Sequence, residues 1–392
     1  MSLTHPPTAC AALFSLAAAL LPMPVGAQPA EVRHTTPIFR LGGPNADDVH
    51  AFPEPPRLVV DAKGYIYARI PSDGAVTVFD PDGAFVRRIG GKGEGPGEFQ
   101  IAAAHGLLGD TLWIINWPTP RVSRFLTNGT HIDTERTPFD YGRSFGGPVG
   151  LDALLRDGRA VVRPPSPVLG VDEPIRLPVL LGTAPAMDER DTIASMATPR
   201  GMFIPGLGTW TFTPVAAPPL VAMASNGAGI AVATWSDTAP GIVEVRVYAP
   251  DGSARWRRSI RLDARVIPAS VRDSLIAVGV EKARPQVERA RAQGRIAGGS
   301  LEKMVERGLS LPRHFAPVGR LLIGIDDTVW LQQMNGLTPD DWLVLDRAGA
   351  LHARVRVPAG LRVEEASMQD IWGTAQDDLD VAWMVRLRVV GR

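Results

Sequence analysis

The chain has 392 residues, 45% of them hydrophobic, and its 41 Lys and Arg residues balance 41 Asp and Glu residues. A net charge of zero provides no broad basic surface for nucleic acid or anionic lipid, although a local basic patch remains compatible with it. The 40 glycines and 36 prolines are typical of a chain with many turns and argue against a mainly helical protein.

The first 27 residues predict a secretion signal. The run Ala11–Leu21 is apolar but too short to cross a bilayer, and Val25–Ala27 places small residues where a signal peptidase cleaves. The segment before this run lacks Lys and Arg, which is unusual for a signal. We expect residues 28–392 to be a single periplasmic or secreted domain, with no membrane span. The only cysteine, Cys10, would leave with the signal, which excludes disulfides and thiolate metal sites from the mature chain.

The mature chain consists of short predicted strands separated by turn signals. An isolated strand is predicted at Pro37–Leu41. The first set of four strands is Leu58–Asp61, Tyr65–Ile70, Ala75–Phe79 and Phe85–Ile89. Further sets fall at about 106–135, 149–197, 220–260, 321–357 and 363–387. Four antiparallel strands in about 35 residues are typical of one propeller blade.

The last set is one strand short, and the isolated N-terminal strand has no blade of its own. A propeller must hide its sheet edges, so an N-terminal strand that completes the final blade would close the ring. We therefore predict an all-β fold, a six-bladed β-propeller closed by an N-terminal strand.

Residues 268–312, between blades four and five, predict a helical insertion. Ser270–Arg284 has apolar residues at helical spacing, with Ser270 as a cap and Pro285 as the end. Ser300–Gly308 predicts a second short helix. Two positions remain open for the insertion: partly covering the mouth of the central channel, or packing on the rim.

Three motifs in the first set carry a family resemblance. They are DAKGYIY at 61–67, VFDPDG at 78–83 and GKGEGPGEF at 91–99. Together they resemble an NHL-type repeat, and the mature chain resembles secreted bacterial six-bladed propellers related to NHL-repeat proteins and, more distantly, TolB-like propellers. This resemblance implies the fold but little chemistry, because such propellers host lyases, lactonases, lectin-like binders and scaffolds.

The glycine-rich segment Gly90–Gly97 does not fit a phosphate-binding loop. Gly91-Lys92 is followed by glycine where a P-loop needs Ser or Thr, and no helix pattern follows. We interpret the segment as a connection between blades, with Glu98 and Phe99 as its anchors.

Two serine motifs also favour structural interpretations. Ser144 matches a nucleophile-elbow pattern but is followed by Gly147-Pro148 instead of a helix. Ser300 precedes Lys303 in a Ser-x-x-Lys pattern, and a helix N-cap explains it better.

A metal site would draw its ligands from several inner strands, so no local motif is expected. His105 and His314 lie close to predicted inner strands and are the metal candidates, with Ca²⁺ or Zn²⁺ as the ion. Asp61 and Asp326 follow inner strands but more often serve tight turns. No cofactor is predicted.

The connections on one face of the predicted disc are aromatic and basic, which suits sugars, peptides and carboxylates. The candidate ligand-binding residues are Trp117, Tyr141, Arg143, Phe203, Trp210, Arg313 and His314, with Phe212 beside them. Packing of long loops is the alternative explanation for several of them.

The leading function is therefore noncatalytic binding of a ligand or protein partner, such as a glycan or peptide, at the channel face of a monomer. A rigid disc that presents loops binds with little loss of conformational entropy. The alternative is a metal-dependent hydrolase or lyase with its site in the channel. Neutral charge and predicted export argue against a nucleic-acid partner.

Overall fold

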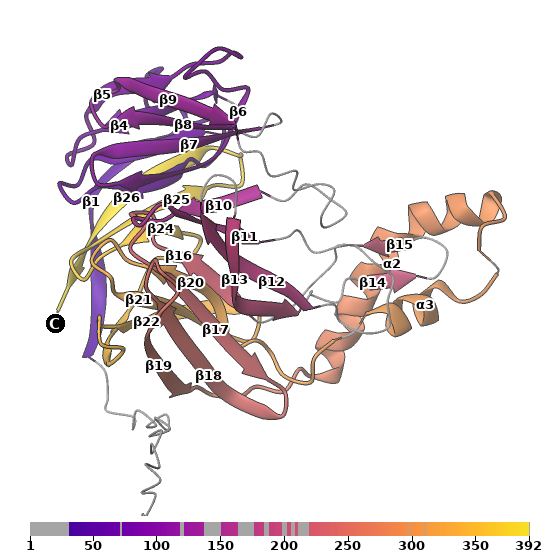
Figure 1. Ribbon diagram of the computed structural model, residues 1–392. Coiled ribbons are helices and arrows are strands. Elements are labelled where there is room, and N and C mark those ends of the chain that lie inside the picture. Colours follow the sequence, from indigo (N-terminus) through magenta and orange to yellow (C-terminus); the bar gives the residue numbers. More distant parts are fainter. Residues whose placement is uncertain are drawn as a thin grey trace, which may run out of the picture.

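A computed structural model shows an all-β six-bladed propeller with a helical insertion, which confirms the predicted fold (Figure 1). The described residues are 31–70, 73–117, 121–136, 150–163, 176–183, 188–197, 202–204, 208–210, 219–296, 298–309 and 311–391. The signal predicted at 1–27 lies outside them. No helix in these ranges has both the length and the apolar character needed to span a bilayer.

Each blade is a meander of antiparallel strands. Blade one contains β2 (Arg57–Val60), β3 (Ile66–Ile70), β4 (Ala75–Phe79) and β5 (Phe85–Gly90). Blade two contains β6 (Ile101–Leu108), β7 (Thr111–Trp117), β8 (Arg121–Leu126) and β9 (His131–Arg136). Blade three contains β10 (Gly150–Leu154), β11 (Arg159–Arg163), β12 (Arg176–Thr183) and β13 (Asp188–Ala197).

The second half of the ring repeats this plan. Blade four contains β16 (Leu220–Met223), β17 (Ile230–Ser236), β18 (Ala239–Tyr248) and β19 (Ala254–Arg261). Blade five contains β20 (Val318–Ile323), β21 (Val329–Asn335), β22 (Thr338–Leu345) and β23 (Leu351–Val355). Blade six contains β24 (Arg362–Ala366), β25 (Asp370–Gln376) and β26 (Ala382–Val390). A separate hairpin, β14 (Met202–Ile204) and β15 (Gly208–Trp210), lies between blades three and four in the sequence.

The N-terminal strand β1 (Glu31–Gly42) closes the ring, as predicted. It pairs antiparallel with β26, from His34 opposite Val390 to Gly42 opposite Trp383. Its first residues also pair in parallel with β23, so blades five and six form one continuous eight-stranded sheet. In Figure 1 the indigo β1 lies beside the yellow β26. One strand therefore covers two outer edges that would otherwise be open to pairing with another chain.

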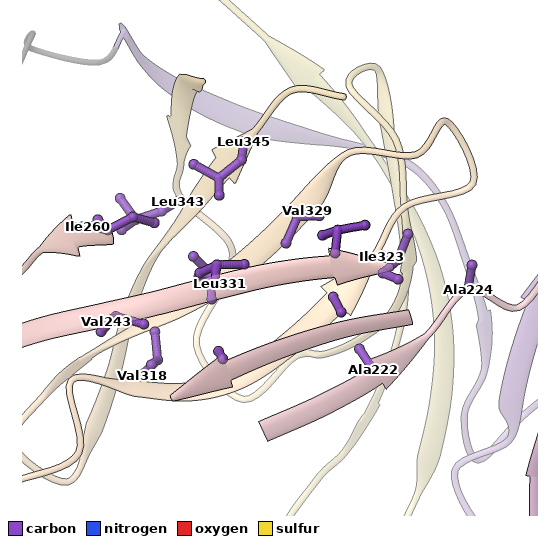
Figure 2. Packing of buried hydrophobic residues seen from close by; sticks show 14 of the residues in the cluster. Ala222, Ala224, Val243, Ile260, Val318, Ile323, Val329, Leu331, Leu343 and Leu345 are labelled. Carbon is purple, nitrogen blue, oxygen red and sulfur yellow. The ribbon is translucent and has the colours of Figure 1, made fainter. Parts of the chain in front are cut away.

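The blades are held together by apolar clusters between neighbouring sheets. In the described part of the chain, each of the six blade junctions has its own cluster of buried side chains. Figure 2 shows the junction of blades four and five, where Val243 and Ile260 of blade four lie in one cluster with Val318, Leu331 and Leu343 of blade five. Because strand residues alternate between the two faces of a sheet, every blade supplies apolar side chains to both neighbours.

The insertion contains α2 (Ala269–Ala292) and α3 (Leu301–Gly308), which extend away from the blades in Figure 1. The predicted start and end of the first helix were wrong. Pro268 occupies the N-cap position in place of Ser270, and α2 continues through Pro285.

Packing explains why the helix continues. Pro285 lacks an N–H and removes one backbone hydrogen bond. Ala283 and Val287, on either side of it, are fully buried in a small core shared with Val305 of α3. The prediction for α3 was correct, since the Ser300 side chain caps it by accepting from the Lys303 backbone N–H at 3.4 Å.

The glycine-rich connection between blades one and two is anchored as predicted. The Glu98 carboxylate accepts from the Gly95 N–H at 2.9 Å, and Phe99 is fully buried with its ring centroid 6.1 Å from that of Phe125. Gly90 has φ +81°, and a Cβ there would lie 2.4 Å from the Phe99 ring. The glycine is required by this close approach.

Candidate functional site

The innermost strands surround the axis of the propeller. Strand β2 contacts β6 and β24, β6 contacts β10, and β20 contacts both β16 and β24. Each of these strands begins on the face that carries the connections between blades, because successive strands of a meander alternate in direction. Residues at the start of the inner strands therefore share the mouth of the central channel.

Four arginines gather around one carboxylate at this mouth. We call Arg57, Arg69, Arg320, Arg362 and Glu364 the arginine cluster. Glu364 accepts from Arg57 Nη1 at 3.0 Å and from Arg362 Nε at 2.6 Å. Arg57 lies opposite Arg69 in the pairing of β2 with β3, and Arg320 lies close enough to Arg57 and Arg362 to be affected by their charges. The cluster joins blades one, five and six.

Arg69 is held by blade two. Its Nη1 donates to the Ala102 carbonyl oxygen, and its Nε donates to His105 Nδ1 at 3.3 Å. His105 Nε2 lies 3.0 Å from the Tyr67 carbonyl oxygen, so the imidazole proton is assigned to Nε2. Burial, followed by the charge of Arg69, lowers the pKa of His105 to about 3. His105 is therefore neutral and acts as an acceptor that orients Arg69.

Arg69 and Arg320 remain charged at neutral pH, although burial makes their charged form less favourable. Burial, followed by the charge of Arg57, lowers the pKa of Arg69 to about 10. Burial, followed by the charge of Arg362, lowers the pKa of Arg320 to about 10. The Arg320 guanidinium makes no hydrogen bond or ion pair with any described residue, and it lies 6.0 Å from the centroid of the Trp342 ring. A partly buried guanidinium in this state has five donors available for an acceptor.

Charge within the cluster is unbalanced. Glu364 attracts both Arg69 and Arg320, and Glu54 also attracts Arg69, while Arg57 opposes the charge of both and Arg362 opposes that of Arg320. The described side chains of the mouth thus carry excess positive charge, and an anionic group would relieve it.

The far end of the channel is closed by the turn between β16 and β17. The Ser225 carbonyl oxygen accepts from the Leu107 N–H of blade two at 2.8 Å, and the Gly227 carbonyl oxygen accepts from the Arg156 N–H of blade three at 3.1 Å. Asn226 Nδ2 donates to the Ile325 carbonyl oxygen of blade five at 3.3 Å. Contacts from one turn to three other blades place it on the axis, as a floor beneath the arginine cluster.

Glu365 of β24 lies at this floor. It is 2% exposed, and its Oε2 has no hydrogen-bond partner in the described structure. Burial raises the pKa of Glu365 to about 8; nearby Ser225 opposes this effect and Glu364 adds to it. The side chain is therefore mostly protonated at neutral pH.

The predicted site residues are only partly described. Trp117, Phe203 and Trp210 lie in β7, β14 and β15, but their side chains lie outside the described part. Tyr141, Arg143 and Phe212 lie entirely outside the described residues. Ligand binding by these six residues stays a prediction.

Arg313 and His314 lie at the base of the insertion. The Asp237 carboxylate accepts from their backbone N–H groups at 2.9 and 3.2 Å, and His314 Nδ1 lies 3.0 Å from Asp237 Oδ1. His314 and His105 thus have separate partners. Among the described residues, no group of three or more His, Cys, Asp or Glu side chains is placed to hold a metal. Metal coordination by either histidine stays a prediction.

Asp61 and Asp326 serve turns, as expected. Asp61 Oδ1 accepts from the Lys63 and Tyr65 N–H groups at 2.9 Å. Asp326 Oδ1 accepts from the Thr328 N–H at 3.3 Å within its turn, and Asp326 Oδ2 accepts from the Met368 N–H of blade six at 2.8 Å.

Sequence reasoning missed the arginine cluster. Its arginines are isolated in the sequence, and Arg57 and Glu364 are 307 positions apart. One feature of the sequence could have indicated the cluster. Several blades have an arginine in one of their two inner strands, where residues of a packed core are usually apolar.

A second cleft of about 500 Å³ opens between blades five and six at the end opposite the channel mouth. Its lining includes Arg33, Asp326, Asp346, Arg347, His352 and Met368. Two arginines here face two aspartates, so the charge is balanced. The channel mouth is the stronger candidate site.

Comparisons with known proteins support the architecture. Residues 56–105, which span blade one and the start of blade two, match the family model DUF5128, described as a 6-bladed beta-propeller. No curated protein sequence matches the chain. A member of the DUF4221 family from Bacteroides vulgatus has a similar structure, with 9% identity, a TM-score of 0.50, and coverage of 93% of this chain and 100% of that chain.

Two further solved structures are more distant. Virginiamycin B lyase from Staphylococcus aureus has 10% identity, covers 90% of this chain and 99% of that chain, and has a TM-score of 0.39. Regucalcin from Agrobacterium tumefaciens, a calcium-binding protein, has 9% identity, covers 93% and 97%, and has a TM-score of 0.39. At these identities the similarities concern the fold alone. By sequence and by structure, this chain is similar to six-bladed β-propeller proteins.

Proposed function

We propose that this protein binds a small anionic ligand, a carboxylate or a phosphate, at the mouth of its central channel without converting it chemically. The observation that carries the proposal is the arginine cluster, above all Arg320, whose guanidinium is partly buried and makes no hydrogen bond or ion pair with a described residue. Folding keeps this charge in place although burial and like charges oppose it. A carboxylate or phosphate would fit the fork of donors on each guanidinium.

Architecture supports a binding role. Arg57 and Arg362 are already oriented by Glu364, and Arg69 is already oriented by His105. A site preorganised by strands loses little entropy when a ligand arrives.

Isothermal titration at low ionic strength with succinate and with inorganic phosphate tests the proposal. Either anion should bind, and Arg320→Gln should weaken binding about 10- to 100-fold, because a hydrogen bond to a charged group is lost. The matched control is Arg356→Gln, which removes an exposed arginine paired with Asp341 on the outer edge of blade five. Absence of binding by both anions, or equal affinity in Arg320→Gln and the wild type, would refute the proposal.

The same titration addresses the metal-dependent alternative. Repeating it with EDTA, then with added Ca²⁺ or Zn²⁺, should leave the affinity unchanged if the arginines alone hold the anion. Binding that disappears with EDTA and returns with one ion would favour a metal centre, and a screen of lactones and esters would follow.

We also propose that the protein is exported and belongs with the propellers related to NHL-repeat proteins. The first described element, β1, begins at Glu31, so cleavage before Gln28 would leave every described strand intact. Mass spectrometry of the protein recovered from the periplasm or medium should give an N-terminus at Gln28. A full-length chain in the cytoplasm would contradict export.

A further inference from the structure

We infer that the floor of the channel is a second subsite, at which Ser225 and Glu365 receive a hydroxyl group of the bound anion. This inference rests on the proposed function and specifies its ligand: an anion that carries a hydroxyl group at its other end.

Two oxygen atoms at the floor are buried without a hydrogen-bond partner in the described structure: Ser225 Oγ and Glu365 Oε2. The two side chains lie close enough to interact, but no hydrogen bond of normal geometry joins them. Nearby, the Trp113 indole and the Ser225 carbonyl oxygen both lie against Gly106, and Trp113 Nε1 is also unpartnered. Buried polar atoms in folded proteins nearly always have hydrogen-bond partners, so this group of unpartnered atoms indicates a binding position for a polar group of a ligand.

Glu364 and Glu365 have different surroundings although they are adjacent in β24. The pairing of β24 with β25 shifts register between Val363 and Glu365. Glu364 meets Arg57 at the mouth, while Glu365 lies near Ser225 of the floor turn. Ser225 as a whole residue is only partly buried.

Strand β6 gives the depth of the floor. His105 orients Arg69 in the cluster, and Leu107 donates to the Ser225 carbonyl oxygen. These two residues are separated by about 7 Å along a strand that rises 3.4 Å per residue. A ligand that reaches both levels therefore needs a chain of several atoms between its anionic group and its polar end.

A hydroxyl is the group that fits this end. A second anionic group would face the carboxyl groups of Glu364 and Glu365, and a cation would have to pass the arginines. A hydroxyl donates and accepts at once, which suits the Ser225 hydroxyl and a carboxyl group that is protonated at neutral pH. Recognition of such a hydroxyl discriminates strongly against ligands that lack it, because they leave the polar atoms unpaired.

Titration with hexanoate and with 6-hydroxyhexanoate tests this inference, since the two acids differ only in the terminal hydroxyl. The hydroxylated acid should bind about fivefold more tightly, within the range for one net hydrogen bond. Ser225→Ala should reduce the ratio of the two affinities to near one without changing the affinity for hexanoate. This variant should fold, because alanine keeps the backbone contact of residue 225 with Leu107.

Glu365→Gln is the matched control, since an amide keeps one donor and one acceptor and should retain part of the preference. Arg320→Gln should weaken both acids equally. Equal affinity of the wild type for the two acids, or a preference that survives Ser225→Ala, would overturn the floor subsite while anion binding at the mouth stands. Failure of hexanoate, succinate and phosphate alike would overturn the proposed function, and this inference with it.

Discussion

Replacing Arg320 by methionine should stabilise the ligand-free protein while weakening anion binding. Burial and the neighbouring arginines lower the pKa of Arg320 by more than two units, to about 10. At about 1.4 kcal/mol per pH unit, keeping this charge costs the folded state on the order of 3 kcal/mol. Because the pKa is lower in the folded protein than in the unfolded chain, the cost is present in full at neutral pH. It is lost only as the pH rises above about 10, towards the ordinary pKa of arginine.

Methionine keeps the apolar stem of arginine and removes the charge, so we expect a gain of about 1–3 kcal/mol in the free energy of unfolding. Urea denaturation at pH 7 in a buffer without carboxylate or phosphate measures it, alongside titration with succinate. Arg356→Met, at an exposed position, should change stability by less than about 0.5 kcal/mol and leave binding intact. Destabilisation by more than about 1 kcal/mol in Arg320→Met would show that Arg320 has a structural partner, which contradicts the reasoning.

Four further predictions concern the framework. Gly106→Ala should destabilise the protein by about 1–3 kcal/mol in urea denaturation, because its Cβ would lie 2.8 Å from the Ser225 carbonyl oxygen; an unchanged midpoint would contradict the tight floor. Pro285→Ala should stabilise α2, with a higher melting temperature, since it restores a backbone hydrogen bond. Glu365→Gln should match the wild type in stability near pH 4 and exceed it by a few kcal/mol at pH 8. The raised pKa of Glu365 makes its burial increasingly unfavourable as the pH rises from about 4.5 to about 8. Deleting residues 28–42, which removes β1, should abolish a single cooperative unfolding transition, and retention of that transition would refute closure by this strand.

The sequence predicts the fold well because each blade is specified locally. Strand Ala75–Phe79 has its predicted boundaries, since glycine and aspartate turns lie on either side of it. The prediction that the first helix ends before Pro285 was wrong. The packing of α2 on α3 outweighs the unfavourable effect of a proline inside the helix.

The site could not be predicted in the same way. His105 was identified by its residue type, but its role as an acceptor for Arg69 depends on how blade two meets blade one. The contact of Ser225 with Leu107 likewise joins two blades that are not neighbours in the ring. Such contacts produce no short motif in the sequence, because the residues that meet are separated along the chain by the length of whole blades.

The candidate site therefore depends on closure of the ring. The arginine cluster takes Arg57 from the first blade and Arg362 with Glu364 from the last, and these blades become neighbours only when the ring is closed. Strand β1 stabilises that closure by completing blade six, while the apolar cluster between blades six and one aligns β24 with β2. Blades folded in an open ring would keep their hydrogen bonds but separate Arg57 from Glu364. Anion affinity should therefore report closure of the propeller more directly than strand content does.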